Sequence, residues 1–329
     1  MTVLAPRRST KLQRSVVVIL LCVVAFLFWP LRCNDGSCYL SEPSPSTSAA
    51  TPLERPNREL VVAKQEREDT TWIDKYLPDW HSNIYVVDDP KAKLTVPTNK
   101  GREAMIYLTY LIDRYDTLPA TTVFLHASRF QWHNDNPDYD GLLSLRNLSF
   151  SYIQQEGYVN LRCVWVLGCP VEIRPATDAF EASVKDPANH EVATKDIFKA
   201  AFEELLPGMP VPDEVGVPCC SQFAVTRETI RRRPREDYVR FRDWLIKTDL
   251  DDSLSGRVLE YSWHIIFGKK AVHCPSASHC YCNLYGMCDL TCTDSECQGR
   301  YVLPAYSTLP AGWPRLGWHG EEREFESPL

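Results

Sequence analysis

Short apolar runs alternate with a helical pattern in the first half of the globular sequence. Residues 60–63, 84–87 and 122–126 are apolar runs of strand length, separated by polar or proline-containing segments. Between the second and third runs, apolar residues from Met105 to Tyr115 recur at 3.6-residue spacing, which predicts a helix capped by Asn99. Strand–helix–strand alternation with short connections is typical of α/β proteins. We therefore expect a mixed, mainly parallel sheet flanked by helices.

The rest of the globular sequence predicts further elements of both kinds. Residues 161–166 and 222–225 are strand candidates, and residues 68–72 open a short helix. Residues 234–247 predict a helix with proline at its start and acidic residues in its first turn. A last helix is predicted over residues 255–267, with a glycine directly after it as the C-cap.

The character of the sequence changes at Cys274. Six cysteines lie in the segment from Cys274 to Cys297, counting both ends, and no helical or strand period is visible around them. The single residue between Cys280 and Cys282 fits a zinc knuckle poorly, so disulfides are the leading interpretation and zinc is the alternative. We predict an α/β domain over residues 59–273, followed by a disulfide-rich irregular tail over 274–329.

The N-terminal sequence indicates targeting to the secretory pathway. Basic residues in segment 1–14 precede the apolar run 16–29, which is shorter than the roughly 20 residues of a typical membrane span. No small-residue cleavage site follows the run, and the positive charge lies upstream of it. We predict a cytosolic tail, a signal anchor over 15–31 and a Ser/Pro-rich stem over 32–58.

This organisation predicts a single-pass type II membrane protein of the Golgi or the endoplasmic reticulum lumen. A cleaved signal peptide, which would make the protein secreted, is the alternative. Of the 13 cysteines, one (Cys22) lies in the apolar run, so an even number remains for pairing in an oxidising compartment. The sequon at Asn147 predicts glycosylation in the same compartment.

The net charge of −7 argues against nucleic acid as a partner, because nucleic-acid-binding proteins usually carry a basic face. The segment Asn99-Lys100-Gly101-Arg102 is the main candidate for binding an anion. A helix start offers free N–H groups, and the two basic residues would add charge for a diphosphate. The alternative is a capped helix start with exposed basic residues.

Polar residues that follow buried strands form a second candidate site. His126, Arg129 and His133 come at and after the third apolar run, and Asp88 and Asp89 follow the second. Imidazole and carboxylate groups at these positions can hold a divalent ion that bridges phosphate oxygens. The alternative is that the two aspartates only shape the turn before Pro90.

Glu260 and His264 lie four residues apart on the last predicted helix, which is apolar enough to be largely buried. Buried charge is rare unless it is paired or functional. Glu260 is therefore a candidate general base, and a structural pair with His264 or Arg257 is the equal alternative. A nucleophile-based hydrolase is disfavoured, because the chain has no Gly-x-Ser-x-Gly motif.

Several long motifs resemble a known family. They include Gly101-Arg102-Glu103-Ala104, Phe124-Leu125-His126, Cys219-Cys220-Ser221-Gln222 and Arg257-Val258-Leu259-Glu260. Together they resemble a mostly fungal family, the domain of unknown function numbered thirty-four thirty-one, over nearly all of the sequence after the stem. The order of elements is in turn similar to nucleotide-sugar glycosyltransferases of the GT-A type. Where those enzymes carry Asp-x-Asp after a buried strand, this chain has His126-Ala127-Ser128.

The resemblance implies a luminal glycosyltransferase-like enzyme whose partners are a nucleotide sugar and a glycan or small-molecule acceptor, with Mn²⁺ or Mg²⁺ as cofactor. A non-catalytic module for glycan or protein binding, and a metal-dependent hydrolase, are the rival hypotheses. The predicted catalytic residues are Glu260 and His264, and the predicted metal ligands are Asp88, Asp89 and His126. The predicted substrate contacts are Asp69, Lys100, Gly101, Arg102, Arg129 and His133.

Overall fold

A computed structural model describes residues 31–34, 37–40, 58–135, 139–183 and 192–288, together with residues 290, 292, 295–297 and 322. The chain divides into two units, Met1–Arg55 and Pro56–Leu329. In the first unit, β1 (Leu31–Asn34) and β2 (Ser37–Leu40) pair antiparallel. A hairpin therefore occupies the start of the predicted stem. Residues 15–30 of the predicted signal anchor (15–31) and residues 41–57 of the predicted stem (32–58) lie outside the described residues. No helix in the described part of the chain is long and apolar enough to span a membrane.

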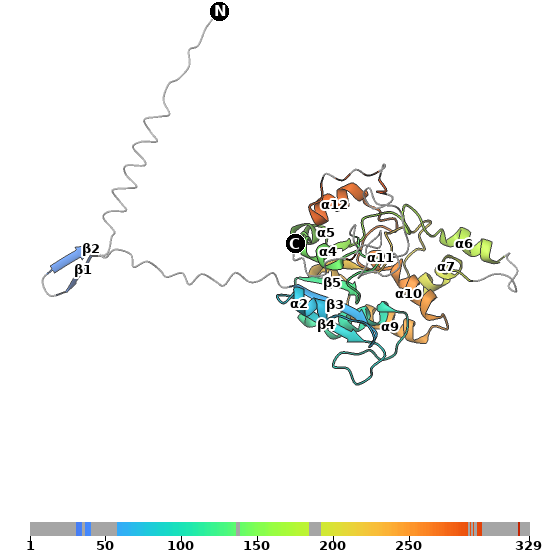
Figure 1. Ribbon diagram of the computed structural model, residues 1–329, viewed down its shortest axis with the longest axis horizontal. Helices are drawn as coiled ribbons and strands as arrows, with labels where there is room; N and C mark the ends of the chain where they lie inside the picture. Colours follow the sequence, from blue (N-terminus) through green and yellow to red (C-terminus); the bar gives the residue numbers. More distant parts are fainter. Residues whose placement is uncertain are drawn as a thin grey trace, which may run out of the picture. The chain divides into compact units, whose positions relative to one another are not determined.

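The second unit is built on a five-stranded mixed sheet (Figure 1), which confirms the predicted α/β class. Its strands, in spatial order, are β4 (His81–Val86), β3 (Arg58–Lys64), β5 (Thr121–His126), β7 (Phe223–Thr226) and β6 (Tyr158–Asn160). β4, β3 and β5 are parallel, whereas β7 runs antiparallel to both of its neighbours. The sheet therefore has four strands in one direction and one inverted strand.

The strand predicted at 161–166 is wrong, because the corresponding strand of the sheet is β6 (Tyr158–Asn160), just before that segment. Polar side chains accept hydrogen bonds from backbone N–H groups that would otherwise pair with a neighbouring strand. The Asn160 side chain accepts the N–H of Arg162 at 2.8 Å, and the Asp135 carboxylate accepts the N–H groups of Cys163 and Val164. These bonds satisfy the backbone locally, so the chain leaves the sheet.

α3 (Glu103–Asp113) lies against α9 (Arg235–Lys247), and both helices were predicted. The predicted N-cap of α3, Asn99, is wrong by three residues, because the N-cap is Arg102. Gly101 and Arg102 have φ values of 67° and 55°, which place the chain outside helical geometry until Glu103. A Cβ at Gly101 would come within 2.4 Å of Leu245 on α9, so this close approach requires glycine.

The single helix predicted over 255–267 is two helices, α10 (Asp252–Glu260) and α11 (Trp263–Ile266). At the break, the Ser262 hydroxyl donates to the Val258 carbonyl at 2.7 Å, a side-chain bond that competes with regular helical pairing. The predicted glycine C-cap is Gly268, with φ 82°. The remaining helices are α2 (Thr71–Tyr76), η1 (Tyr115–Thr117), α4 (Gly141–Arg146), α5 (Phe150–Glu156), α6 (Pro175–Ser183), α7 (Thr194–Leu205), α8 (Arg227–Ile230) and α12 (Ala277–Tyr285).

The predicted irregular tail over 274–329 contains a helix, α12, so that prediction is wrong for its first part. Its residues Tyr281 and Leu284 are fully buried, and the Tyr281 hydroxyl donates to Asp135 at 2.6 Å. Two disulfides, Cys163–Cys280 and Cys169–Cys274, join the start of the tail to the α/β domain. The others in the described residues are Cys219–Cys220, Cys282–Cys288 and Cys292–Cys297. The disulfide interpretation of the cysteine cluster is thereby confirmed.

Two apolar layers cover the two faces of the sheet. Alternate residues of β3 point to opposite layers, with Val61 in one and Leu60 and Val62 in the other. The layer that contains Val61 is built from α3, α7, α9, α10 and α11. The other is built from α2, α4, α5 and α12 (Figure 1). Burial on both faces explains why the strands read as continuous apolar runs.

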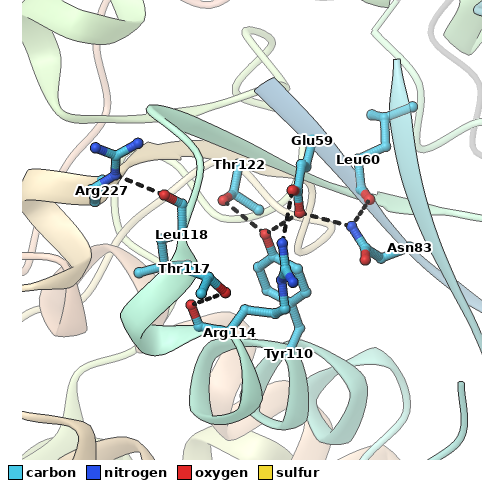
Figure 2. Close-up of polar contacts among 9 residues, drawn as sticks. All are labelled: Glu59, Leu60, Asn83, Tyr110, Arg114, Thr117, Leu118, Thr122 and Arg227. Atoms are coloured by element: carbon cyan, nitrogen blue, oxygen red, sulfur yellow. Dashed lines mark hydrogen bonds and ion pairs between the residues drawn. The ribbon is translucent and has the colours of Figure 1, made fainter. Parts of the chain in front are cut away.

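A buried carboxylate joins the strands to α3 at the amino end of β3 (Figure 2). Glu59, which is 7% exposed, accepts hydrogen bonds from Asn83 of β4 and Tyr110 of α3, both at 2.9 Å. Arg114 forms an ion pair with it at 3.1 Å. Burial raises the pKa of Tyr110, so its hydroxyl remains a donor at neutral pH.

We expect Glu59→Ala to lower the free energy of unfolding by about 2–3 kcal/mol, because it leaves buried donors without their acceptor. Urea denaturation measures the change. Glu203→Ala is the matched control, because Glu203 forms an exposed ion pair with Lys199. That variant should stay within about 0.5 kcal/mol of the wild type. Equal losses in the two variants would show that the Glu59 network does not stabilise the fold.

Candidate functional site

A pocket of about 310 Å³ lies where β3 and β5 end. Ligand sites of α/β proteins form at the carboxyl ends of parallel strands. We call it the strand-end pocket. Its lining residues are Ala63, Lys64, Gln65 and Glu68 at and after the end of β3, Val87 after β4, Asn99, Arg102, Glu103 and Ile106 around the start of α3, His126, Ala127, Gln131 and His133 at and after the end of β5, and Asp252 of α10.

Two histidines face each other in this pocket. The ring centres of His126 and His133 are 4.8 Å apart, edge to face. Gln222, just before β7, holds both segments, because its side chain accepts the His126 N–H at 3.1 Å and donates to the His133 carbonyl at 3.2 Å. Nε2 of His126 is buried and has no hydrogen-bond partner among the described residues. It is an atom that a bound ligand or ion would satisfy.

The predicted anion site before α3 is only partly assembled. Arg102 lines the strand-end pocket and donates to the Ser253 hydroxyl at 2.9 Å. Lys100 instead donates to the Thr248 carbonyl at the end of α9. The N–H of Gly101 donates to the Asp252 carboxylate at 3.3 Å. Of the three predicted residues, Arg102 is therefore the one that brings positive charge to the pocket.

Glu260, at the end of α10, has a strongly shifted pKa. Burial raises the pKa to about 7, and the nearby Glu103 carboxylate adds to the increase. The N–H of Cys220, which donates to Glu260 at 2.5 Å, opposes this effect, as do the charges of Arg257 and Arg102. A carboxyl with a pKa near 7 can exchange a proton at neutral pH. Glu260 does not itself line the strand-end pocket, but Glu103 and Arg102, whose charges act on its pKa, do.

His264, the other predicted catalytic residue, is fully buried on α11 and does not line the strand-end pocket. Its Nε2 is 2.8 Å from the carbonyl of Ala271. Burial lowers its pKa to about 4, so the ring is neutral at physiological pH. The position of His264 is that of a core residue.

The predicted metal ligands do not come together. Asp88 accepts the N–H of Glu66 at 2.7 Å, and Asp89 accepts the N–H of Lys91 at 2.9 Å. These bonds shape loops, and neither aspartate lines the pocket of His126. In the described part of the chain, the group of three possible metal ligands is Cys219, Cys220 and Glu260. Its two cysteines form a disulfide, which removes their thiolates as ligands.

Asp69 and Arg129, both predicted to contact substrate, lie in a second cavity of about 440 Å³ beside α2. We call it the α2 cavity. Arg129 forms a two-pronged ion pair with Asp140, with bonds of 2.8 and 2.7 Å. The N–H of Thr71 donates to Asp69 at 2.9 Å and lowers its pKa.

Sequence reasoning missed several residues of the strand-end pocket. Lys64, Gln65 and Glu68 follow the first buried strand, so the rule that strand ends line sites would have found them. Gln222 and Asp252 gave no such signal, because they reach the site from distant elements. The side chain of Asn147 is exposed after α4, where a glycan would not disturb the core.

The raised pKa of Glu260 predicts a pH-dependent loss of stability. The folded state holds this proton more tightly than the unfolded chain, whose pKa is about 4.5. The stabilisation is therefore full below about pH 4.5 and is lost as the pH rises through about 7. Between pH 4.5 and 8, the free energy of unfolding of the wild type should fall by about 2–3 kcal/mol relative to that of Glu260→Gln.

Urea denaturation of both proteins across this range measures that difference. Glu228→Gln, which removes an exposed carboxylate, controls for the change in net charge. If the difference in free energy of unfolding between wild type and Glu260→Gln does not change with pH, folding does not raise the pKa of Glu260.

Comparison with known proteins identifies the family of the chain. A family model described as "Protein of unknown function (DUF3431)" matches residues 60–283, well over half of the 329 residues. No curated protein and no solved structure matches the chain. The matched span includes the five-stranded sheet except the first two residues of β3, both cavities and Glu260. The chain therefore belongs to the DUF3431 family.

Proposed function

We propose that the chain is a glycosyltransferase-like enzyme that binds a nucleotide-sugar donor in the strand-end pocket. The observation that supports this most is the composition of the pocket. Basic, acidic and imidazole groups from four separate segments converge where parallel strands end. A concave site of this size with a few convergent polar groups is typical of small-ligand binding. The mixed α/β sheet agrees with the resemblance to GT-A enzymes.

In this proposal, Lys64 and Arg102 bind the diphosphate of the donor. Phosphate oxygens accept hydrogen bonds and carry negative charge, and the two side chains offer donors with positive charge. The Ser253 contact of Arg102, at 2.9 Å, orients the guanidinium. The nearby carboxylates of Glu68, Glu103 and Asp252 suit the hydroxyl groups of a ribose or sugar, because carboxylates accept hydrogen bonds from hydroxyls.

His126 and His133 are the protein ligands that we propose for a divalent ion. The buried, unpartnered Nε2 of His126 and the adjacent His133 ring fit such a role, whereas Asp88 and Asp89 do not line the pocket. When bound, Mn²⁺ or Mg²⁺ would neutralise charge that develops on the leaving diphosphate.

Glu260 is the general base of the proposed reaction. Its pKa of about 7 leaves a substantial fraction ionised at neutral pH, and the ionised form accepts a proton from an acceptor hydroxyl. The N–H of Cys220 holds one oxygen of the carboxylate at 2.5 Å and so fixes its direction.

The proposed setting is the lumen of the secretory pathway. The disulfides of the second unit support an oxidising compartment, where such bonds persist. The anchor over residues 15–31 and the type II topology belong to the same proposal, with the secreted form as its alternative.

Thermal unfolding of the full-length chain with UDP or GDP, each with and without Mn²⁺, tests donor binding. One nucleotide at 100 times its dissociation constant should add about 2.7 kcal/mol of stability, more when Mn²⁺ is present. Arg102→Ala should abolish the shift, because it removes the guanidinium from the pocket. Arg146→Ala, at the exposed end of α4, is the matched control and should keep it.

If no nucleotide stabilises the folded protein, the donor proposal is wrong. A non-catalytic binding module would then be the better interpretation, and stoichiometric zinc in the purified chain would favour a metal-dependent hydrolase.

Glu260→Gln should abolish turnover of the bound donor without preventing folding. Release of the nucleoside diphosphate from UDP- and GDP-sugars measures turnover, and far-UV circular dichroism checks the fold. The amide retains an oxygen that can accept the Cys220 N–H but cannot take up the proton. Turnover at the wild-type rate would remove Glu260 from the mechanism.

A further inference from the structure

The α2 cavity has the size of a ligand site and is not part of the strand-end pocket. It is lined by α2 with the residues just before it, and by the loop that follows β5. Its volume of about 440 Å³ falls in the range of roughly 300–1,000 Å³ that is typical of ligand pockets.

Aromatic rings form much of the wall of the α2 cavity. Trp72 is 7% exposed, and its indole N–H donates to the Ala127 carbonyl at 2.9 Å. Tyr76, one turn later on α2, and Phe130, on the facing loop, are partly exposed. The guanidinium of Arg129 lies over both rings, 4.9 Å from the centre of Tyr76 and 4.7 Å from that of Phe130. These contacts fix the rings before any ligand arrives.

The polar groups of the α2 cavity include both donors and acceptors, with little net charge. Asp69 has a lowered pKa and is therefore an ionised acceptor, and Lys75 is a donor of opposite charge. The charge of Arg129 is matched by Asp140. Phosphate oxygens only accept hydrogen bonds, whereas sugar hydroxyls both donate to an acceptor such as Asp69 and accept from a donor such as Lys75. This balance favours a neutral, hydroxyl-rich ligand over an anion.

The two cavities share a wall. Glu68 lines the strand-end pocket and the next residue, Asp69, lines the α2 cavity. After β5, Ala127 lines the strand-end pocket and the next residue, Ser128, lines the α2 cavity. The backbone of these two segments therefore lies between the two cavities.

We propose that the α2 cavity binds a neutral saccharide. The apolar face of a sugar ring packs on Phe130, and its hydroxyls bond to Asp69 and Lys75. This binding does not rest on the proposed function, because it uses none of the residues of the strand-end pocket.

An array of neutral hexose and N-acetylhexosamine oligosaccharides, probed with the full-length chain, tests the assignment. The best-retained oligosaccharide is then titrated by calorimetry. Phe130→Ala should weaken its binding at least about tenfold, because it removes the ring on which the sugar packs. Phe180→Ala is the matched control, since Phe180 is 69% exposed on α6 and lines neither cavity. That variant should bind with wild-type affinity.

Three results would overturn the assignment. They are the absence of binding to every neutral oligosaccharide, stronger binding of inorganic phosphate than of any of them, and unchanged affinity in folded Phe130→Ala. Should Phe130→Ala fail to fold, Tyr76→Ala answers the same question. Nucleotide stabilisation that depends on Arg102, without saccharide binding, would reject this inference and leave the proposed function standing.

Discussion

The inverted strand β7 is the constraint on which the candidate site depends. Because β7 runs antiparallel to β5, the residues that precede it lie at the edge where β5 ends. Gln222 therefore meets the backbone of His126 and His133, and its side chain also donates to Asn134 at 3.2 Å. A parallel strand in this position would have brought its carboxyl end to the same edge instead. The inversion thus supplies a rigid, buried connection between the two histidine segments.

The same inversion controls the environment of Glu260. The segment before β7 contains Cys220, whose N–H donates to this carboxylate at 2.5 Å. The disulfide to Cys219 and the contact of Arg162 with the Cys220 sulfur, at 3.2 Å, hold that segment in place. A buried carboxylate with one backbone donor is only partly compensated for its loss of solvation, which explains its raised pKa.

Glu59, which is buried, and Glu260, which is partly buried, lie at opposite edges of the sheet and differ in how well their charge is paired. Glu59, at the amino edge, is matched by Asn83, Tyr110 and Arg114 (Figure 2), and its bonds connect two strands to α3. Glu260, near the carboxyl edge, has the Cys220 N–H and the more distant charges of two arginines. The first arrangement surrounds the carboxylate with donors and a cation, and the second leaves Glu260 with a pKa near neutral pH.

The sequence by itself determined the features that depend on local patterns. The apolar runs of β3 and β5 and the acidic first turn of α9 were predicted closely, because burial and helix-end electrostatics act on neighbouring residues. The cysteine count and spacing indicated disulfides in the same direct way. Residues at strand ends line ligand pockets, so the sequence predicted His126 and His133 as site residues, and both line the strand-end pocket.

Only the tertiary structure decided which residues meet. The start of α3 depends on Leu245, which packs against Gly101 from another helix. Lys100 bonds to a carbonyl 148 residues away, which sequence spacing cannot reveal. Asp69 and Arg129 were predicted as substrate contacts, but the cavity they share is formed by the packing of α2 against the loop after β5. Contacts between distant segments follow from how whole layers pack on the sheet, whereas periodicity reports only which face of each element is buried.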